Sequence, residues 1–307
     1  MSTDQTNFFH FPILALVPDF EEEVVISENF SIKKRLWQTS TFDLATLQSE
    51  HDLSISYQIM DVFLSNVNLE ISIKDVPCRD FAIKAFNALR LGLYVQGISP
   101  FLVPYISTHS INEYSGINSR DSKSLREELP LGLQEGITSD SATVSAWPME
   151  MAFSWIVLNE SLKVNEKRFK AAASFARSWM KLIEDDKKLD AIQSILISAP
   201  KILPASQSLL HLWSGIESMF PKVRSELSFR ISLYLAVLLD STSERKEIYD
   251  IVRDSYKLRS KITHGSLSSI EIDSWKQTWN LMLRAIKAIE KNKGLPKEDE
   301  LLDNLLI

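Results

Sequence analysis

The pattern of hydrophobic and polar positions changes period along the chain, from strand-like in the first half to helical in the second. Apolar residues alternate with polar ones over residues 53–59 and again over residues 69–73, which is the period of a half-buried strand. Residues 30–37 and 101–107 are predicted as further strands, the second of them split by Pro104. The first half of the chain is therefore expected to form an α+β region.

One helix is predicted inside this region. Apolar side chains recur every four residues from Phe81 to Leu93, so residues 79–94 should form an amphipathic helix. Residues 115–145 are rich in Ser, Gly, Asn and charged residues, and a long loop is predicted there.

From about residue 150 the pattern predicts helices almost throughout. Helices are expected at residues 153–162, 167–184, 189–197, 206–220 and 227–239. The last of these is so uniformly apolar that we expect it to lie centrally in the fold. These patterns predict two domains: an α+β domain over residues 1–150, of unknown role in sensing or recognition, and an all-α domain over residues 151–307.

Two further helices carry signals at both ends. Ser241 and Ser268 are each followed by a glutamate three residues later, the spacing of a capping box. The first helix should end at Gly265 and the second at Gly294, because glycine takes the left-handed conformation that ends helices. Residues 298–307 show only a weak apolar pattern.

Composition and charge limit the class of protein. The 307 residues are 45% hydrophobic and 24% charged, which predicts an ordinary folded, soluble protein. The net charge of −6 means that any nucleic-acid site must be local. Cys78, the only cysteine, excludes an internal disulfide and thiolate zinc clusters. The start lacks the pattern of a signal peptide, and the apolar runs are shorter than a membrane span requires, so a cytoplasmic location without membrane contact is expected.

A local excess of positive charge precedes Gly265. Residues 253–261 hold four basic side chains against one acidic side chain, Asp254; the basic residues are Arg253, Lys257, Arg259 and Lys261. Arg253, Lys257 and Lys261 are candidate RNA-binding residues, and Tyr256 could stack on a base or bind a phosphate. Such a run is also typical of a solvated helix face, and a histidine before a terminal glycine, here His264, often caps the helix.

Arg259 and His264 are the candidate catalytic pair. An imidazole can take a proton from a ribose 2′-hydroxyl or give one to the leaving 5′-oxygen. A guanidinium binds phosphate oxygens and stabilises the charge of the transition state, so this chemistry requires neither a metal nor a cofactor. The product would be a 2′,3′-cyclic phosphate.

The spacing of this pair constrains the site. Five residues of α-helix advance about 7.5 Å and turn about 140°, so the two side chains do not share a face. They would converge if Arg259 curled along the helix, if the last turn were distorted, or if two copies faced each other across a dimer axis. The other histidines (His10, His51, His109 and His211) lack metal-ligand spacing and are predicted to be surface or core residues.

Residues 256–265 resemble the signature of the HEPN superfamily, in which an arginine is followed by a histidine after four to six residues, and in particular its Apea-like branch. The likeness covers residues 204–307. Residues 209–220, which contain Leu-Trp-Ser-Gly-Ile-Glu ending at Glu217, resemble the upstream helix of that branch, and residues 229–239 and 279–289 resemble its central and last helices.

The resemblance implies an all-α HEPN helical bundle, commonly a homodimer, with endoribonuclease activity in toxin or antiphage defence systems that respond to a trigger or partner protein. It assigns catalysis to Arg259 and His264 and suggests that Glu217 orients Arg259. Ser260 stands where related nucleases often have Asn, Asp or His, and a serine is a poorer ligand or proton relay than these residues. The alternative is a non-catalytic module for dimerisation and for binding RNA or a nucleotide, which Ser260 and the acidic net charge favour.

Overall fold

A computed structural model describes residues 7–35, 45, 56–102, 105–108, 144–146, 162–239 and 244–306. The chain divides into two compact units that interleave in the sequence. The sheet unit comprises residues 1–86, 97–153 and 158–173, and the helical unit comprises residues 87–96, 154–157 and 174–307. The boundary predicted near residue 150 lies outside the described residues.

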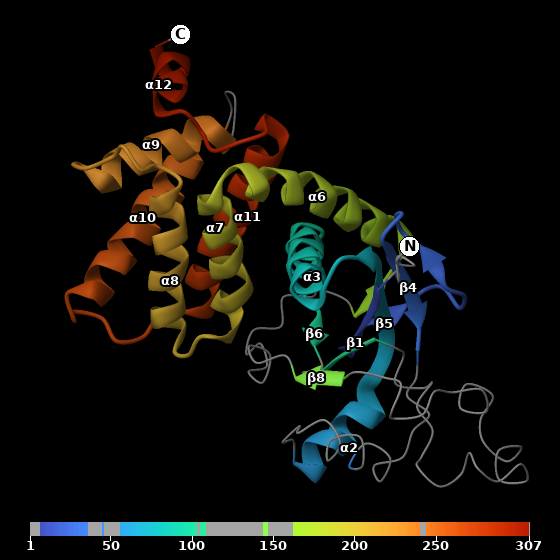
Figure 1. Ribbon diagram of the computed structural model, residues 1–307. Coiled ribbons are helices and arrows are strands. Elements are labelled where there is room, and N and C mark those ends of the chain that lie inside the picture. The colour runs from blue at the N-terminus through green and yellow to red at the C-terminus, as the bar shows by residue number, and fades with distance from the viewer. Residues whose placement is uncertain are drawn as a thin grey trace, which may run out of the picture. The chain divides into compact units, whose positions relative to one another are not determined.

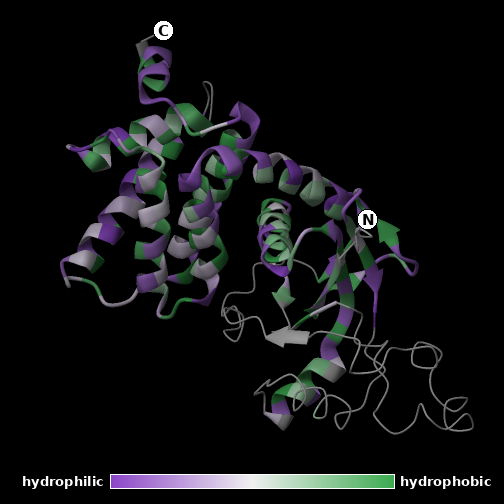
Figure 2. Ribbon diagram, in the orientation of Figure 1, coloured by the Kyte–Doolittle hydropathy of each residue, from purple (hydrophilic) through white to green (hydrophobic). Residues whose placement is uncertain are grey.

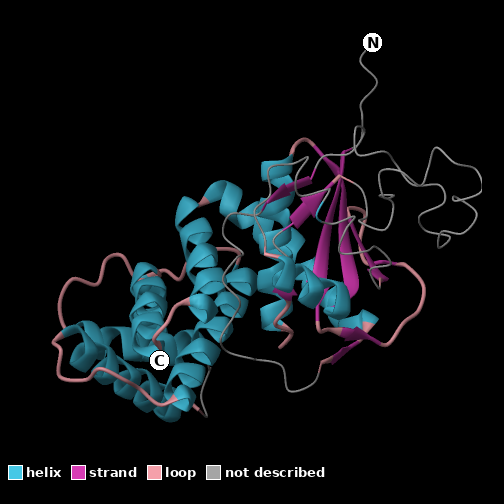
Figure 3. Cartoon of the chain, turned by 90° about the horizontal axis from the view of Figure 1, so that it is seen from below, coloured by secondary structure: helices cyan, strands magenta, loops and turns pink. Residues whose placement is uncertain are grey.

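The sheet unit is built on an antiparallel sheet whose strands run side by side in Figure 3. Its strand order is β3 (Val24–Val25), β4 (Phe30–Lys34), β5 (Val67–Val76), β1 (Asn7–Leu14), β7 (Tyr105–Ser107) and β8 (Val144–Ala146), with β6 (Phe101–Leu102) also paired to β1. A separate parallel pair joins β2 (Val17–Pro18) to β9 (Lys163–Val164). The α+β prediction for the first half is thus confirmed, including the split of residues 101–107 into two strands.

Alternate residues of the central strands lie on opposite faces of this sheet. Phe11, Ile71 and Ile32 are fully buried on the apolar face, where the ring of Phe11 stacks on that of Phe86 at 4.2 Å. Phe86 belongs to α3 (Arg79–Val95), so this helix covers the apolar face. The opposite face carries polar residues, because His10 of β1 pairs in register with Ser72 of β5.

One predicted strand is a helix instead. Residues 57–59 belong to α2 (Tyr57–Asn66), whereas residues 53–55 lie outside the described residues. The local alternation was misleading because the buried residues that follow, Met60, Phe63 and Val67, are spaced by three and four positions. That spacing is helical, and it extends further than the alternation.

The helix at residues 79–94 is confirmed, and polar as well as hydrophobic residues follow its ribbon in Figure 2. Phe81 is exposed, whereas from Ala85 to Tyr94 nearly every side chain is buried. Even Arg90 is enclosed, and its Nε donates a hydrogen bond to the Tyr94 hydroxyl at 3.0 Å.

The chain from residue 166 onward is mainly helical (Figure 1). The elements are α6 (Glu166–Asp185), α7 (Lys187–Ser198), the 3-10 turn η3 (Ala199–Lys201), α8 (Ala205–Ser218), α9 (Leu227–Leu239), α10 (Arg245–Thr263), α11 (Ile272–Asn292) and α12 (Glu298–Leu306). These confirm the predicted helices after residue 166 to within a few residues. Residues 153–161 lie outside the described residues, Leu162 is not helical, and residues 144–146 form a strand where a loop was predicted. Among the described helices, none has the length and hydrophobicity to cross a bilayer.

The core of the helical unit joins α8 to α11. Trp213 and Trp275 are fully buried, and the Trp275 indole donates a hydrogen bond from Nε1 to Ser208 Oγ at 2.8 Å. Gly215 allows the close approach, because a Cβ at this position would lie only 2.5 Å from Met282 Cε. In α9 most side chains between Ile231 and Val237 are buried, whereas Phe229 at its start is 53% exposed.

The capping box predicted at Ser268 does not form, because Glu271 is itself the N-cap residue of α11 and its side chain makes no capping hydrogen bond. Ser241, which would begin the other predicted box, lies outside the described residues. Glu244 pairs with Arg284 at 3.4 Å. At the end of α11 the left-handed residue is Lys293, with φ 58°, rather than Gly294.

Candidate functional site

The end of α10 has the hydrogen bonding of a Schellman motif. The Gly265 N–H donates to the Ile262 carbonyl at 3.0 Å, and the Ser266 N–H donates to the Lys261 carbonyl at 2.8 Å. Gly265 has φ +70°, as the sequence predicted. His264 is the C-cap residue and is exposed, and its backbone N–H donates to the Ser260 carbonyl. The motif therefore holds His264 at a fixed point on the surface.

Replacing Gly265 by alanine is expected to lower the free energy of unfolding by about 1–2 kcal/mol, because a Cβ is strained at positive φ. No atom lies within 4 Å of that Cβ, so the cost is conformational rather than steric. Gly294→Ala is the matched control: its Cβ is equally unobstructed and its φ is not positive, so stability should hold or rise slightly. Urea denaturation of both variants measures the difference, and equal midpoints would contradict the assignment.

Arg259 is held between two neighbours. Its Nη2 lies 3.2 Å from Oε1 of Glu217 on α8, and both side chains are about a quarter exposed, at 28% and 26%. The contact is an ion pair without the alignment of a hydrogen bond. The guanidinium also lies 5.6 Å from the ring centre of Tyr256, a cation–π distance. The structure thus brings together three of the predicted residues, Arg259, Glu217 and Tyr256.

A buried chain of hydrogen bonds adjoins Arg259, Glu217 and Tyr256, and it contacts this group through Trp213. Trp213 meets the Tyr256 ring edge to face at 5.1 Å, and its Nε1 donates to Ser255 Oγ at 3.0 Å. Ser255 Oγ is also 2.6 Å from Thr278 Oγ1. Three helices, α8, α10 and α11, meet in this chain, so it fixes the rotation of α10 that directs Arg259 towards α8. The sequence pattern did not predict these contacts of Ser255 with Trp213 and Thr278.

His264 and Arg259 do not meet within the described part of one chain. Arg259 faces α8, whereas His264 sits at the helix end, in agreement with the turn of about 140° expected for five residues. Ser260 between them is half-buried. Thr263 Oγ1 donates to the Arg259 carbonyl at 2.9 Å, which tightens the last turn without moving the two functional side chains together.

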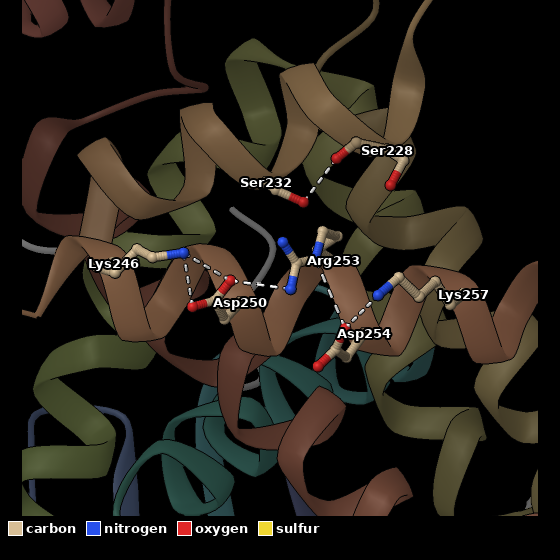
Figure 4. Close-up of polar contacts among 7 residues, drawn as sticks. All are labelled: Ser228, Ser232, Lys246, Asp250, Arg253, Asp254 and Lys257. Carbon is tan, nitrogen blue, oxygen red and sulfur yellow. Dashed lines mark hydrogen bonds and ion pairs between the residues drawn. The ribbon is translucent and has the colours of Figure 1, made fainter.

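The predicted RNA-binding residues are partly neutralised (Figure 4). Arg253 lies 3.0 Å from Asp250 and 3.6 Å from Asp254, and Lys257 lies 2.8 Å from Asp254. Lys246 also pairs with Asp250. The local positive excess is unchanged, because Lys246 and Asp250 join the group together, but Arg253 and Lys257 are held in ion pairs. Lys261 is exposed and takes no part in these ion pairs.

Two titratable groups near this surface have shifted pKa values. The hydrogen bond from Lys257 lowers the pKa of Asp254, which favours the ionised form of this carboxyl. Burial lowers the pKa of His211, whose Nε2 lies 2.7 Å from Ser198 Oγ of α7. His211 therefore belongs to the contact between α7 and α8.

Of the other histidines named from the sequence, His51 and His109 fall outside the described residues. Within the described ranges, no three His, Cys, Asp or Glu side chains are grouped so that they could hold a metal ion. Comparisons with protein-family models, curated protein sequences and solved structures find no match to this chain.

Proposed function

We propose that the protein is a metal-independent endoribonuclease of the Apea-like HEPN type, with Arg259 and His264 as its catalytic residues. The observation that carries this proposal is the ion pair between Arg259 and Glu217 at 3.2 Å, which joins α8 to α10 where the resemblance placed an orienting acid. The exposed His264 at the fixed end of α10 is accessible to a large substrate such as RNA.

In the proposed reaction an imidazole removes the proton of a ribose 2′-hydroxyl. The 2′-oxygen then attacks the adjacent phosphorus, the bond from phosphorus to the 5′-oxygen breaks, and the leaving oxygen takes a proton from an imidazolium. Arg259 stabilises the additional negative charge on the phosphoryl oxygens. The products are a 2′,3′-cyclic phosphate and a 5′-hydroxyl end, so atoms and charges balance without a further reactant.

A composite site in a homodimer fits this reaction best. One His264 can serve as both base and acid, because the imidazolium formed when it takes the 2′-hydroxyl proton can give a proton to the leaving 5′-oxygen. Arg259 of one copy could then act with His264 of the other, which removes the need for the two to meet in one chain. Ser260 and Tyr256 would border this site, and Arg253, Lys257 and Lys261 would contact the RNA backbone.

A defence or toxin role in the cytoplasm follows from the same proposal. The sheet unit would then respond to a trigger or partner protein and the helical unit would cut RNA. This assignment rests on the resemblance of residues 204–307.

The test is cleavage of RNA by the purified full-length protein in the presence of EDTA. Structured and unstructured RNAs are incubated with the protein, and the new ends are assayed for a 2′,3′-cyclic phosphate and a 5′-hydroxyl. We expect both ends to appear together. Intact RNA across all substrates, or ends that carry a 5′-phosphate, would contradict the proposal.

A second candidate function is a non-catalytic module that dimerises and binds RNA or a nucleotide. The pairing of Arg259 with Glu217 favours it, because a guanidinium that is already paired with a carboxylate stabilises less of the charge of a transition state. Such a module would retain RNA in a gel-shift assay and leave it uncut.

A further inference from the structure

The polar face of the sheet carries a cluster of titratable side chains that the proposed nuclease site does not use. His10 of β1, Glu70 and Ser72 of β5, Lys33 of β4 and Arg35 just beyond it line one depression of about 320 Å³. They gather there because the strand register sets His10 beside Ser72 and Lys33 beside Glu70. All of these residues belong to the sheet unit.

Glu70 is the buried centre of this cluster. Its side chain is only 1% exposed, and its Oε1 lies 3.3 Å from His10 Nδ1 and 3.6 Å from Arg35 Nε. A buried carboxylate is costly unless cations or donors surround it. Glu70 therefore serves to hold the His10 ring and the Arg35 guanidinium in place at the wall of the depression.

The cluster is not a serine-nucleophile triad. Ser72 Oγ lies 2.9 Å from His10 Nδ1, the same nitrogen that Glu70 approaches. A triad needs the acid on one ring nitrogen and the serine on the other. Within the described part of the chain, the polar contacts of His10 are all made through Nδ1. This geometry favours binding over nucleophilic catalysis.

The depression offers more hydrogen-bond donors than acceptors to a ligand. Lys33 forms no ion pair with any described residue. Arg35 also lines the depression, and its Nε faces Glu70 Oε1 at 3.6 Å. Ser31 adds a hydroxyl donor. Of the two carboxylates, Glu70 is already occupied and Glu23 is exposed at the rim. Such a set suits an anionic oxygen ligand, and guanidinium and ammonium groups are the usual partners of phosphate.

We propose that this depression binds a small phosphate-bearing ligand of nucleotide size. Its volume lies at the lower end of small-molecule sites. Phe8, which is 42% exposed and also lines the depression, offers an aromatic surface on which a base can stack. The proposal goes beyond the nuclease assignment and does not depend on it.

The experiment measures binding of AMP, inorganic phosphate and adenosine to the full-length protein by isothermal titration calorimetry. AMP is expected to bind, and Lys33→Gln is expected to weaken that binding at least tenfold, because a charge-assisted contact is lost. Lys34→Gln is the matched control: the neighbouring lysine on the same strand pairs with Glu21 and does not line the depression, so affinity should be unchanged. Thermal melting without ligand checks that both variants fold.

The three probes separate the possible sources of the anion. Binding of AMP that is much tighter than that of phosphate supports a nucleotide, and equal binding of the two supports free phosphate; either result upholds the anionic site. Adenosine binding as tightly as AMP would overturn the proposal, because the phosphate would then contribute nothing. No binding of any probe, or equal losses in Lys33→Gln and Lys34→Gln, would overturn it as well.

Discussion

The His264→Ala variant is expected to cut RNA about 100- to 10,000-fold more slowly than the wild type, the range that a positioned acid or base contributes. Its stability should change little, because His264 is exposed and the hydrogen bonds that end α10 come from the backbone. Initial rates of cleavage in EDTA give the first quantity and urea denaturation the second. Ser266→Ala, at an exposed position two residues further on, is the control and should cut normally.

A mixing experiment separates a composite site from a site within one chain. His264→Ala and Arg259→Gln subunits are each expected to be inactive alone. When they are unfolded together and refolded, a mixed dimer contains one site with both wild-type residues if Arg259 and His264 come from different copies. Recovery of about a quarter of the wild-type rate is expected from random pairing. Failure to recover any activity, with dimers present, would exclude the composite arrangement.

The Trp213→Ala variant is expected to lose about 3–5 kcal/mol of unfolding free energy, the typical cost of removing a large aromatic side chain from a core. Trp213 is fully buried, supports the Tyr256 ring, and donates to Ser255, which contacts Thr278. The deletion therefore leaves a cavity between α8 and α10 and a buried hydroxyl group with fewer partners. Urea or thermal unfolding measures the loss.

Trp213→Phe separates the ring from its N–H group. It keeps most of the apolar contact and removes the hydrogen bond to Ser255, so a smaller loss of about 1–3 kcal/mol is expected. Thr278→Val tests the next link of the chain and should be partly redundant with Trp213→Phe, because the two changes act on one hydrogen-bonded group. If Trp213→Ala were as stable as the wild type, the buried chain would have no role in fixing α10.

Helices after residue 166 could be predicted from sequence because their buried residues repeat at helical spacing over many turns. The start of α11 differs from the prediction, because the helix begins after Glu271 and the capping signal at Ser268 is not used. The strand prediction for residues 57–59, which belong to α2, was wrong. A short alternation before Met60 agreed with a strand, whereas the residues that pack in the core follow it.

For the candidate site, the family resemblance singled out Glu217 and Arg259, which the structure brings into contact. The pairing of Trp213 with Ser255 and Thr278 was not predicted, because it requires knowing how three helices are rotated against each other. The His10 cluster was missed in the same way. His10 and Glu70 are 60 residues apart, and only the pairing of β1 with β5 makes them neighbours.

The contact between Glu217 and Arg259 also limits the direction from which a phosphodiester can reach the guanidinium. A guanidinium presents its five N–H groups in one plane, and the carboxylate occupies the edge that faces α8. The guanidinium carbon of Arg259 also lies over the Tyr256 ring, 5.6 Å from its centre. A phosphate at the proposed site would therefore have to approach an edge of the guanidinium that does not face α8.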